Sequence, residues 1–401
     1  MIPSRLYLSD HLLNDVVGHH LGYNLALADA ARGMGVPVEL VTHRQFDSDL
    51  ASGFEVIPLF HTDHRFAPPS LISQSQRMLS WLASWSACRF AWDLKGLPPM
   101  RSSDAVFAQM LAPRHFLEWL KWFRRQSTPP VLFLHLGYSP EKFSSPEIAL
   151  TIASLGRKLQ DRVFLVTDSE KLAPAFESIL DESVHYLPHI ISYDFPCPVS
   201  REGSQPLVIF VPGNARREKG FVEVCQAVKL LGDDGNNYAL SFVIQCHDPD
   251  AICGEILQSG ICKEEGGDRI KGIEWIESPL SDDEYIRLLA QADVILMPYH
   301  LDCYARRTSG IFCEARVLGK PVITTRGSWA GDRVEREGGG WLVNEKDISS
   351  LARTLNAVPT EFVAKRTDAQ RLADQSKNEF HREAFMRKLL ELFAGVPNEN
   401  I

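Results

Sequence analysis

The sequence lacks the features that mark several broad classes of protein. Its eight cysteines include no CxxC pair, which argues against a zinc site and favours reduced thiols over a disulfide framework. No apolar run approaches the roughly 20 residues of a membrane span, and the start MIPSRLYLSDHLL has no signal-peptide pattern. Acidic residues (51) outnumber basic ones (42) and no basic tail is present, so a nucleic-acid partner is not expected. These absences predict a cytoplasmic globular protein.

The sequence does contain a regular alternation of strand-like and helix-like segments. Its 401 residues predict two domains of about 150–200 residues each. Short runs that are apolar on both faces predict strands of buried parallel sheets. In the first half these are Arg5–Leu8, Val38–Val41, Val56–Leu59, Ala105–Ala108, Val131–Leu134, Val163–Val166 and Val184–Leu187. In the second half they are Leu207–Val211, Leu240–Cys246, Ile273–Ile276, Val294–Met297, Val322–Thr325 and Trp341–Val343.

Helix signals lie between these strands. A capping-box spacing from Ser281 to Glu284 begins a helix that extends to Gln291, and Gly319 ends a helix over 310–318. Further helices are predicted near 219–231, at 348–355 and at 368–393. Repeated βαβ units with right-handed crossovers therefore predict an α/β fold with a doubly wound sheet in each half.

The stretch 196–206, rich in proline, serine and glycine, is the best candidate for a linker. It predicts an N-terminal Rossmann-like domain at 1–197 and a C-terminal one at 206–367. The helical segment 368–401 could pack back toward the N-terminal domain. Two such domains in tandem are expected to face each other across a cleft, and open α/β sheets bind ligands beyond the carboxyl ends of their strands. Functional residues are therefore expected in loops that directly follow strands.

The loop VPGNARREKGF, residues 211–221, follows such a strand. Gly213 and Gly220 permit tight turns, while Arg216, Arg217 and Lys219 add positive charge beside a helix N-terminus, which itself attracts phosphate. The pattern is neither a Walker A loop nor GxGxxG, so it indicates neither ATP hydrolysis nor nicotinamide chemistry. It predicts a site for a multiply charged anion; the alternative is a solvated turn with an internal Arg–Glu pair.

A second loop supports the anion site. Ser309, Gly310 and Ile311 begin another helix after the strand Val294–Met297, and they offer further N–H groups to an anion. Glu314 lies about one turn into that helix, where a carboxylate can accept hydrogen bonds from a ribose diol. Two helix N-termini and this carboxylate together suit a nucleoside diphosphate; a buried structural Glu314 is the alternative.

These segments resemble retaining glycosyltransferases of the GT-B fold, in particular family 4 (group 1). RREKGF is similar to the family's G-R-x(n)-K-G phosphate segment, and SGIFCEARVLGKPVITT is similar to its E-x7-E region. Two positions differ: Asn214 replaces the arginine that usually follows the first glycine, and Arg306 replaces the first glutamate, which in the family contacts the donor sugar. The resemblance also implies that Gly18 and His19 lie near the donor phosphates and that His135 lies beside the transferred sugar.

The resemblance implies a cytoplasmic enzyme that transfers a sugar from a nucleotide diphosphate sugar to a hydroxyl acceptor with retention and without an obligatory metal. Lys219, Arg216 and His135 are its expected catalytic residues. The expected acceptor is a saccharide or lipid-linked saccharide, in polysaccharide or glycoconjugate synthesis. Two alternatives stay open: a catalytically silent nucleotide-sugar-binding protein that regulates a partner, and a nucleotide-sugar epimerase.

Three further patterns have a structural and a functional interpretation. Asp47 with Asp49, and Asp248 with Asp250, have the DxD spacing of metal-binding loops, and 61–64 (HTDH) offers two histidines; surface loops are the favoured interpretation of each. In the tryptophan-rich segment 76–97, Met78, Trp81, Trp85 and Trp92 share one helical face. That face is expected in the core, with an acceptor groove or a helix on the inner membrane surface as the alternative.

Overall fold

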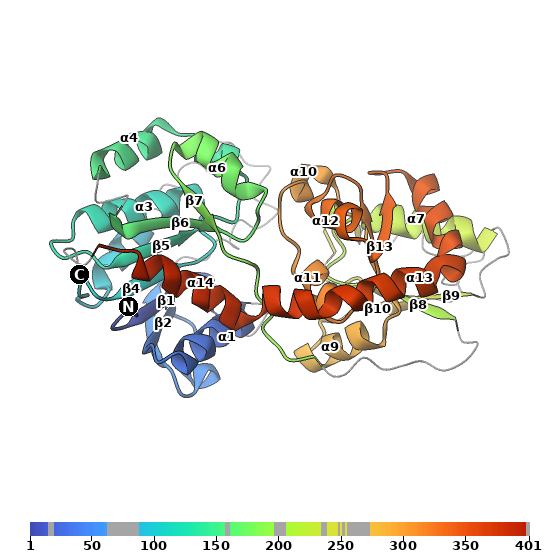
Figure 1. The fold of residues 1–401 in the computed structure, drawn as a ribbon, viewed down its shortest axis with the longest axis horizontal. Coiled ribbons are helices and arrows are strands. Elements are labelled where there is room, and N and C mark those ends of the chain that lie inside the picture. The colour runs from blue at the N-terminus through green and yellow to red at the C-terminus, as the bar shows by residue number, and fades with distance from the viewer. Residues whose placement is uncertain are drawn as a thin grey trace. The chain divides into compact units, whose positions relative to one another are not determined.

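The computed structural model describes residues 1–14, 20–61, 88–156, 161–195, 206–233, 239–247, 249–250, 253–254 and 273–397. The chain divides into two compact units (Figure 1). Unit 1 comprises Met1–Tyr193 with His381–Ile401, and unit 2 comprises Asp194–Phe380. Among the described residues, no helix combines the length and the apolar character that crossing a membrane requires.

Unit 1 is built on a seven-stranded parallel sheet with the order β3-β2-β1-β4-β5-β6-β7. Its strands are β1 (Leu6–Ser9), β2 (Val38–His43), β3 (Glu55–Phe60), β4 (Ala105–Ala108), β5 (Val131–His135), β6 (Val163–Thr167) and β7 (Val184–Tyr186). β2 and β3 are added on one side of β1, and β4 to β7 are added on its other side. The place between β1 and β4 is therefore the switch point where such folds bind ligands. All seven predicted strands are present, and no end is shifted by more than two residues.

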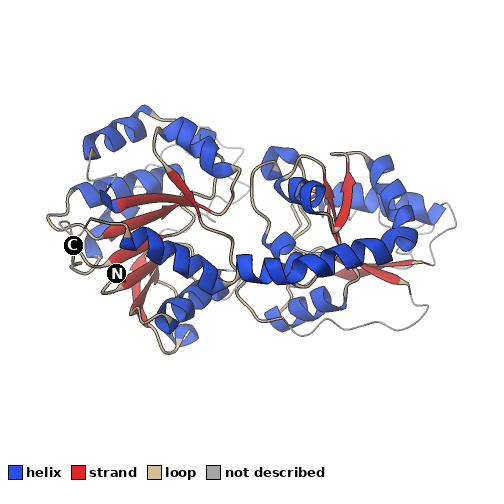
Figure 2. Cartoon of the chain, viewed as in Figure 1, coloured by secondary structure: helices blue, strands red, loops and turns tan. Residues whose placement is uncertain are grey.

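Both faces of this sheet are covered, as the apolar runs predict. Consecutive residues of one strand face opposite sides of the sheet. Val106 packs in one core with Phe116 and Trp119, whereas Phe107 packs with Phe385 on the other face. Figure 2 shows the strands with helices beside them. The helices of unit 1 are α1 (His20–Gly33), α3 (Pro113–Arg124), α4 (Pro146–Leu155), α6 (Leu172–Leu180) and α14 (Arg382–Ala394).

Unit 2 is built on a six-stranded parallel sheet with the order β10-β9-β8-β11-β12-β13. Its strands are β8 (Leu207–Val211), β9 (Leu240–Gln245), β10 (Ile273–Ile276), β11 (Val294–Met297), β12 (Val322–Thr325) and β13 (Gly340–Val343). Its helices are α7 (Phe221–Asp233), α9 (Asp282–Gln291), α10 (Leu301–Tyr304), α11 (Gly310–Val317), α12 (Trp329–Glu337) and α13 (Ile348–Phe380). The six predicted strands and the capping box of Ser281 and Glu284 are confirmed.

The prediction of separate helices at 348–355 and 368–393 was wrong. Helix α13 continues through Pro359, because its buried stripe from Leu351 to Leu372 stays packed in unit 2 on both sides of the proline. The helical path breaks instead at His381, whose side chain accepts a hydrogen bond from the Glu383 N–H and caps α14. Helix α14 then packs beside α1 in unit 1 (Figure 1).

Candidate functional site

The loop after β8 makes a further turn before its helix begins. The predicted helix near Lys219 begins only at Phe221, because a 3₁₀ turn (Arg217–Lys219) and the left-handed Gly220 (φ 72°) come first. A Cβ atom on Gly220 would collide with the carbonyl oxygen of Pro298, just beyond β11. Glycine is therefore required here both for the backbone angle and for the close approach of the two loops.

Side chains from the end of β9 and from the segment after it brace this loop. Gln245 Oε1 accepts the Gly213 N–H at 2.6 Å, and Asp250 Oδ2 accepts the Arg217 N–H at 2.7 Å. These two backbone N–H groups are already hydrogen-bonded within the protein. The loop therefore presents mainly its side chains, and Asp250 serves as a brace.

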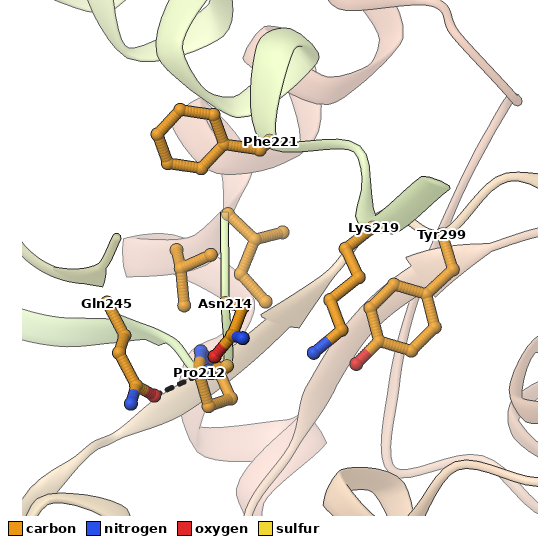
Figure 3. A pocket seen from close by; sticks show the side chains of 9 residues that line it. Pro212, Asn214, Lys219, Phe221, Gln245 and Tyr299 are labelled. Carbon is orange, nitrogen blue, oxygen red and sulfur yellow. Dashed lines mark hydrogen bonds between the residues drawn. The ribbon is translucent and has the colours of Figure 1, made fainter. Parts of the chain in front are cut away.

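The ammonium group of Lys219 lies directly against Gly213. Gly213 has φ 93°, and a Cβ atom there would overlap Lys219 Nζ. Both residues line a small pocket with Val211, Pro212, Asn214, Phe221, Gln245, Leu296 and Tyr299 (Figure 3). Burial first, and then the nearby Arg216 guanidinium, lower the pKa of Lys219 to about 8. Among the described residues, Lys219 Nζ forms no salt bridge with a carboxylate, so the structure places a poorly compensated cation in this pocket.

The second predicted loop meets the first at Tyr299. Figure 3 shows the Tyr299 hydroxyl and the Lys219 amine pointing toward the same space. Tyr299 is buried, and burial raises its pKa; the nearby Ser309 side chain opposes part of this rise. Ser309 also accepts the Phe312 N–H at 3.3 Å and so caps α11. The Ile311 side chain approaches Gly213 from this loop. Lys219 and the N-terminus of α11, with Gly310 as its first residue, thus belong to one site.

Glu314 lies on α11 and has a structural partner. Its Oε2 accepts a hydrogen bond of 2.6 Å from the hydroxyl of Tyr285, on α9, and its side chain is only 8% exposed. Its negative charge also acts on Lys219, whose pKa it raises against the larger effects of burial and Arg216. Glu314 therefore contributes both to the packing of α11 and to the electrostatics of the site.

The charges of two arginines act on Lys219. Arg216, which the sequence predicted, and Arg307, which it did not, both oppose protonation of Lys219. The Arg307 guanidinium lies 5.9 Å from the centroid of the Tyr304 ring, and that ring lies 4.2 Å from the Tyr299 ring. All four arginines of these two loops, Arg216, Arg217, Arg306 and Arg307, are exposed. The signal for Arg307 was its place in the same ARRTSG segment as Arg306.

In unit 1, polar side chains stand at the carboxyl ends of neighbouring strands. His135 ends β5; burial lowers its pKa, and its Nδ1 has no hydrogen-bond partner among the described residues. His20 Nδ1 lies 2.9 Å from Asp10 Oδ2, just after β1. Gly18 and His19 lie outside the described residues. The sequence-predicted His135 thus belongs to a larger polar edge.

The sequence analysis missed the hydrogen-bonded chain at this edge. Gln109 Nε2 donates to Asn24 Oδ1 at 2.6 Å, and Asn24 Nδ2 donates to Asp10 Oδ2 at 2.9 Å. Burial raises the pKa of Asp10, but His20 and the hydrogen bonds from Leu12 and Asn24 outweigh it, and the net pKa is lowered. Asp10 and Gln109 directly follow β1 and β4, so the rule that singled out His135 applied to them as well.

The remaining patterns have mainly structural roles where the structure describes them. Asp47 accepts the Asp49 N–H and caps a short 3₁₀ turn, and His61 Nδ1 lies 2.7 Å from Asp93 Oδ1. Trp92 is 65% exposed, so it does not lie in the core as predicted. Asp248, residues 62–64, Met78, Trp81 and Trp85 lie outside the described residues. The described residues contain no cluster of three or more His, Cys, Asp or Glu side chains suited to a metal.

Two parallel, doubly wound units of seven and six strands define the GT-B architecture of glycosyltransferases. Residues 205–360, which lie within unit 2, match the family model of glycosyl transferases group 1. No curated protein matches the chain in sequence. The fold and the matched segment are both those of glycosyltransferases, as the resemblance implied.

Solved structures match the fold along nearly the whole chain. A glycosyltransferase from Rickettsia africae has a TM-score of 0.66 and 13% identity, covering 99% of both chains. The HepE protein of Anabaena, in complex with UDP and glucose, has a TM-score of 0.65 and 12% identity, covering 98% of this chain and 99% of its own. A UDP-forming α,α-trehalose-phosphate synthase from Burkholderia xenovorans, in complex with glucose-6-phosphate, has a TM-score of 0.63 and 16% identity, covering 97% of this chain and 100% of its own. At these identities the likeness concerns the fold.

Proposed function

We propose that the protein transfers a sugar from a nucleoside diphosphate sugar to a hydroxyl group of a saccharide acceptor, with retention, in the synthesis of a polysaccharide or glycoconjugate. The observation that carries this proposal is the Lys219 ammonium, held against Gly213 without a salt bridge in the described part of the chain. A buried charge is costly unless it is paired. A diphosphate in this pocket would supply the missing pair.

The mechanism follows from where charge develops. When the glycosidic C–O bond breaks, its electron pair passes to the diphosphate oxygen while the anomeric carbon becomes cation-like. Lys219, Arg216 and Arg307 would stabilise this negative charge, and the N-terminus of α11 at Ser309–Ile311 adds its positive dipole end. With these cations present, we propose that no metal is required for turnover. The resemblance to the retaining family 4 supports retention, and HepE bound to UDP and glucose makes UDP-glucose the first donor to test.

We assign the acceptor to the polar edge of unit 1. His135 offers a ring nitrogen to a sugar hydroxyl, while Asp10 and Asn24, which are fully buried and hydrogen-bonded to each other, hold this edge in shape. The orphaned Nδ1 of the buried His135 supports this assignment, because buried polar atoms normally have partners. A lipid-linked saccharide would present the same hydroxyl chemistry, and vesicle flotation of the protein would distinguish it from a free saccharide.

The test is a panel of UDP, GDP, ADP and dTDP sugars. A donor that binds the folded protein raises its melting temperature. We then expect that donor to release its nucleoside diphosphate when saccharide acceptors are present. Binding without release would support the regulatory alternative, and a changed sugar without any acceptor would indicate an epimerase. No thermal shift with any donor would contradict the proposal.

The affinity for UDP-glucose should fall as the pH rises above about 8. The pKa of Lys219 is lowered to about 8, so the ammonium is present below that pH and is lost above it. If only the charged form binds, the dissociation constant rises toward about tenfold per pH unit. Calorimetry from pH 7 to 9.5 measures this change. Lys219→Arg, which stays charged, should remove the decline. A constant affinity in the wild type would contradict the assignment.

A further inference from the structure

Gln245, on the neighbouring strand β9, holds the backbone of the loop at residues 211–221. It is the last residue of β9 and is 5% exposed. Its Oε1 accepts the Gly213 N–H at 2.6 Å, and its Nε2 lies 3.1 Å from His247 Nδ1. Because the N–H of Gly213 needs an acceptor, the amide oxygen must face the loop. Both ends of the amide are therefore engaged, and its orientation is fixed.

The position of Gly213 in turn decides where the Lys219 ammonium can lie. The hydrogen that takes the place of a Cβ on Gly213 faces Lys219 Nζ, and the Ile311 side chain approaches the same point at 3.6 Å. Figure 3 shows Gln245 and Lys219 on opposite sides of the loop, with the hydrogen bond of Gln245 drawn as a dashed line. Gln245, Gly213 and Ile311 form a continuous line of contact from β9 to the start of α11.

We propose that Gln245 is a positioning residue for the donor diphosphate, acting through the Gly213 N–H to keep the loop in the shape that holds Lys219 Nζ beside the N-terminus of α11. This inference rests on the proposed function. A neutral amide suits the role, because it accepts the backbone hydrogen bond without placing a negative charge next to an anion. A carboxylate would accept the same bond but would repel the diphosphate.

The main variant is Gln245→Met, which keeps the length of the side chain and removes the acceptor. We expect the affinity for UDP-glucose and for inorganic pyrophosphate to fall about tenfold, the scale of one lost buried hydrogen bond. Gln245→Glu separates the hydrogen bond from the charge: it should weaken pyrophosphate more than it weakens the uncharged nucleoside uridine. If Gln245→Met fails to fold, Gln245→Asn, one methylene too short for the bond, replaces it.

A second readout needs no ligand. Competitive labelling with acetic anhydride, followed by peptide mass spectrometry from pH 6 to 11, reports the pKa of Lys219 directly. In the wild type we expect a midpoint near the pKa of about 8. In Gln245→Met the loop relaxes and Lys219 gains access to water, so the midpoint should move upward toward the ordinary value for lysine. A loss of stability alone would not produce that shift.

The matched control is Asp293→Ala. Asp293 Oδ2 accepts the Val208 N–H at 2.8 Å, a bond of the same kind at the other end of β8. This variant should lose stability without moving the Lys219 midpoint or the affinity. An unchanged midpoint and unchanged affinity in Gln245→Met would overturn the role of Gln245. If the wild type itself binds neither UDP-glucose nor pyrophosphate, the proposed function fails, while the labelling midpoint still decides whether Gln245 controls Lys219.

Discussion

Lys219→Ala should lower the turnover of sugar transfer by about 10²–10³-fold, or about 3–4 kcal/mol of transition-state stabilisation. Lys219 Nζ is fixed against Gly213 and beside Tyr299, so its charge is in place before the diphosphate leaves. Because the site is partly shielded from water, a cation there stabilises developing charge more than it would in bulk solvent. Alanine leaves only Arg216, Arg307 and the N-terminus of α11 to stabilise the diphosphate. Steady-state kinetics with the donor identified by the panel measures the effect.

The matched control is Lys229→Ala, on the exposed face of α7 that follows the same loop. It removes an equal charge outside the pocket and should leave turnover within about twofold, since exposed charges are strongly screened. Both variants should melt close to the wild type. Removal of the buried charge can even raise the stability of Lys219→Ala. Full turnover in a folded Lys219→Ala protein would withdraw Lys219 from the mechanism.

Gly220→Ala should destabilise unit 2 by about 2–5 kcal/mol. Forcing a Cβ into the left-handed backbone of Gly220 costs about 1–2 kcal/mol, and overpacking against the Pro298 carbonyl adds about 1–3 kcal/mol. The carbonyl belongs to the backbone after β11, so it cannot swing aside as a side chain would. Calorimetry should show an earlier transition for unit 2.

Gly33→Ala provides the opposite case. Gly33 ends α1 in unit 1, its φ is not positive, and a Cβ there would meet no other atom within 4 Å. Alanine should therefore be neutral or stabilise the protein by up to about 1 kcal/mol. An equal loss of stability in the two variants would show that the contact with Pro298 is not the cause.

Most of the strands were predictable because they are buried on both faces; the edge strands β3 and β10 are largely half-buried or exposed. A run such as Val131–Leu134 has no polar face, so the sequence predicts a buried strand there, and β5 lies at this position. Helices were harder to predict, because tertiary packing decides where they end, and α13 continues through Pro359. Helix α12 (Trp329–Glu337) was not predicted, because its segment is rich in charged residues and glycine. The local sequence pattern alone does not determine the extent of α13 or the presence of α12.

The site was predictable where its chemistry is local. Lys219, Arg216 and Ser309 could be predicted because each lies in a loop after a strand, next to a helix start. Gln245 and Tyr299 were not, because they act through neighbours on other strands; Gln245 is separated from Gly213 by 32 positions. Arg307 was overlooked beside Arg306, since adjacent arginines cannot be ranked without knowing which one faces the ring of Tyr304.

The pairing of α14 with α1 makes unit 2 an insertion within unit 1. The chain enters unit 2 at Asp194 and leaves it at Phe380, so unit 1 is completed only by the segment after His381. A fragment that stopped at Tyr193 would expose the apolar surface that Phe385, Leu389 and Phe393 cover, and it should aggregate. Dissection of the two halves therefore requires residues 194–380 to be excised as one piece, with a short bridge joining the ends that remain.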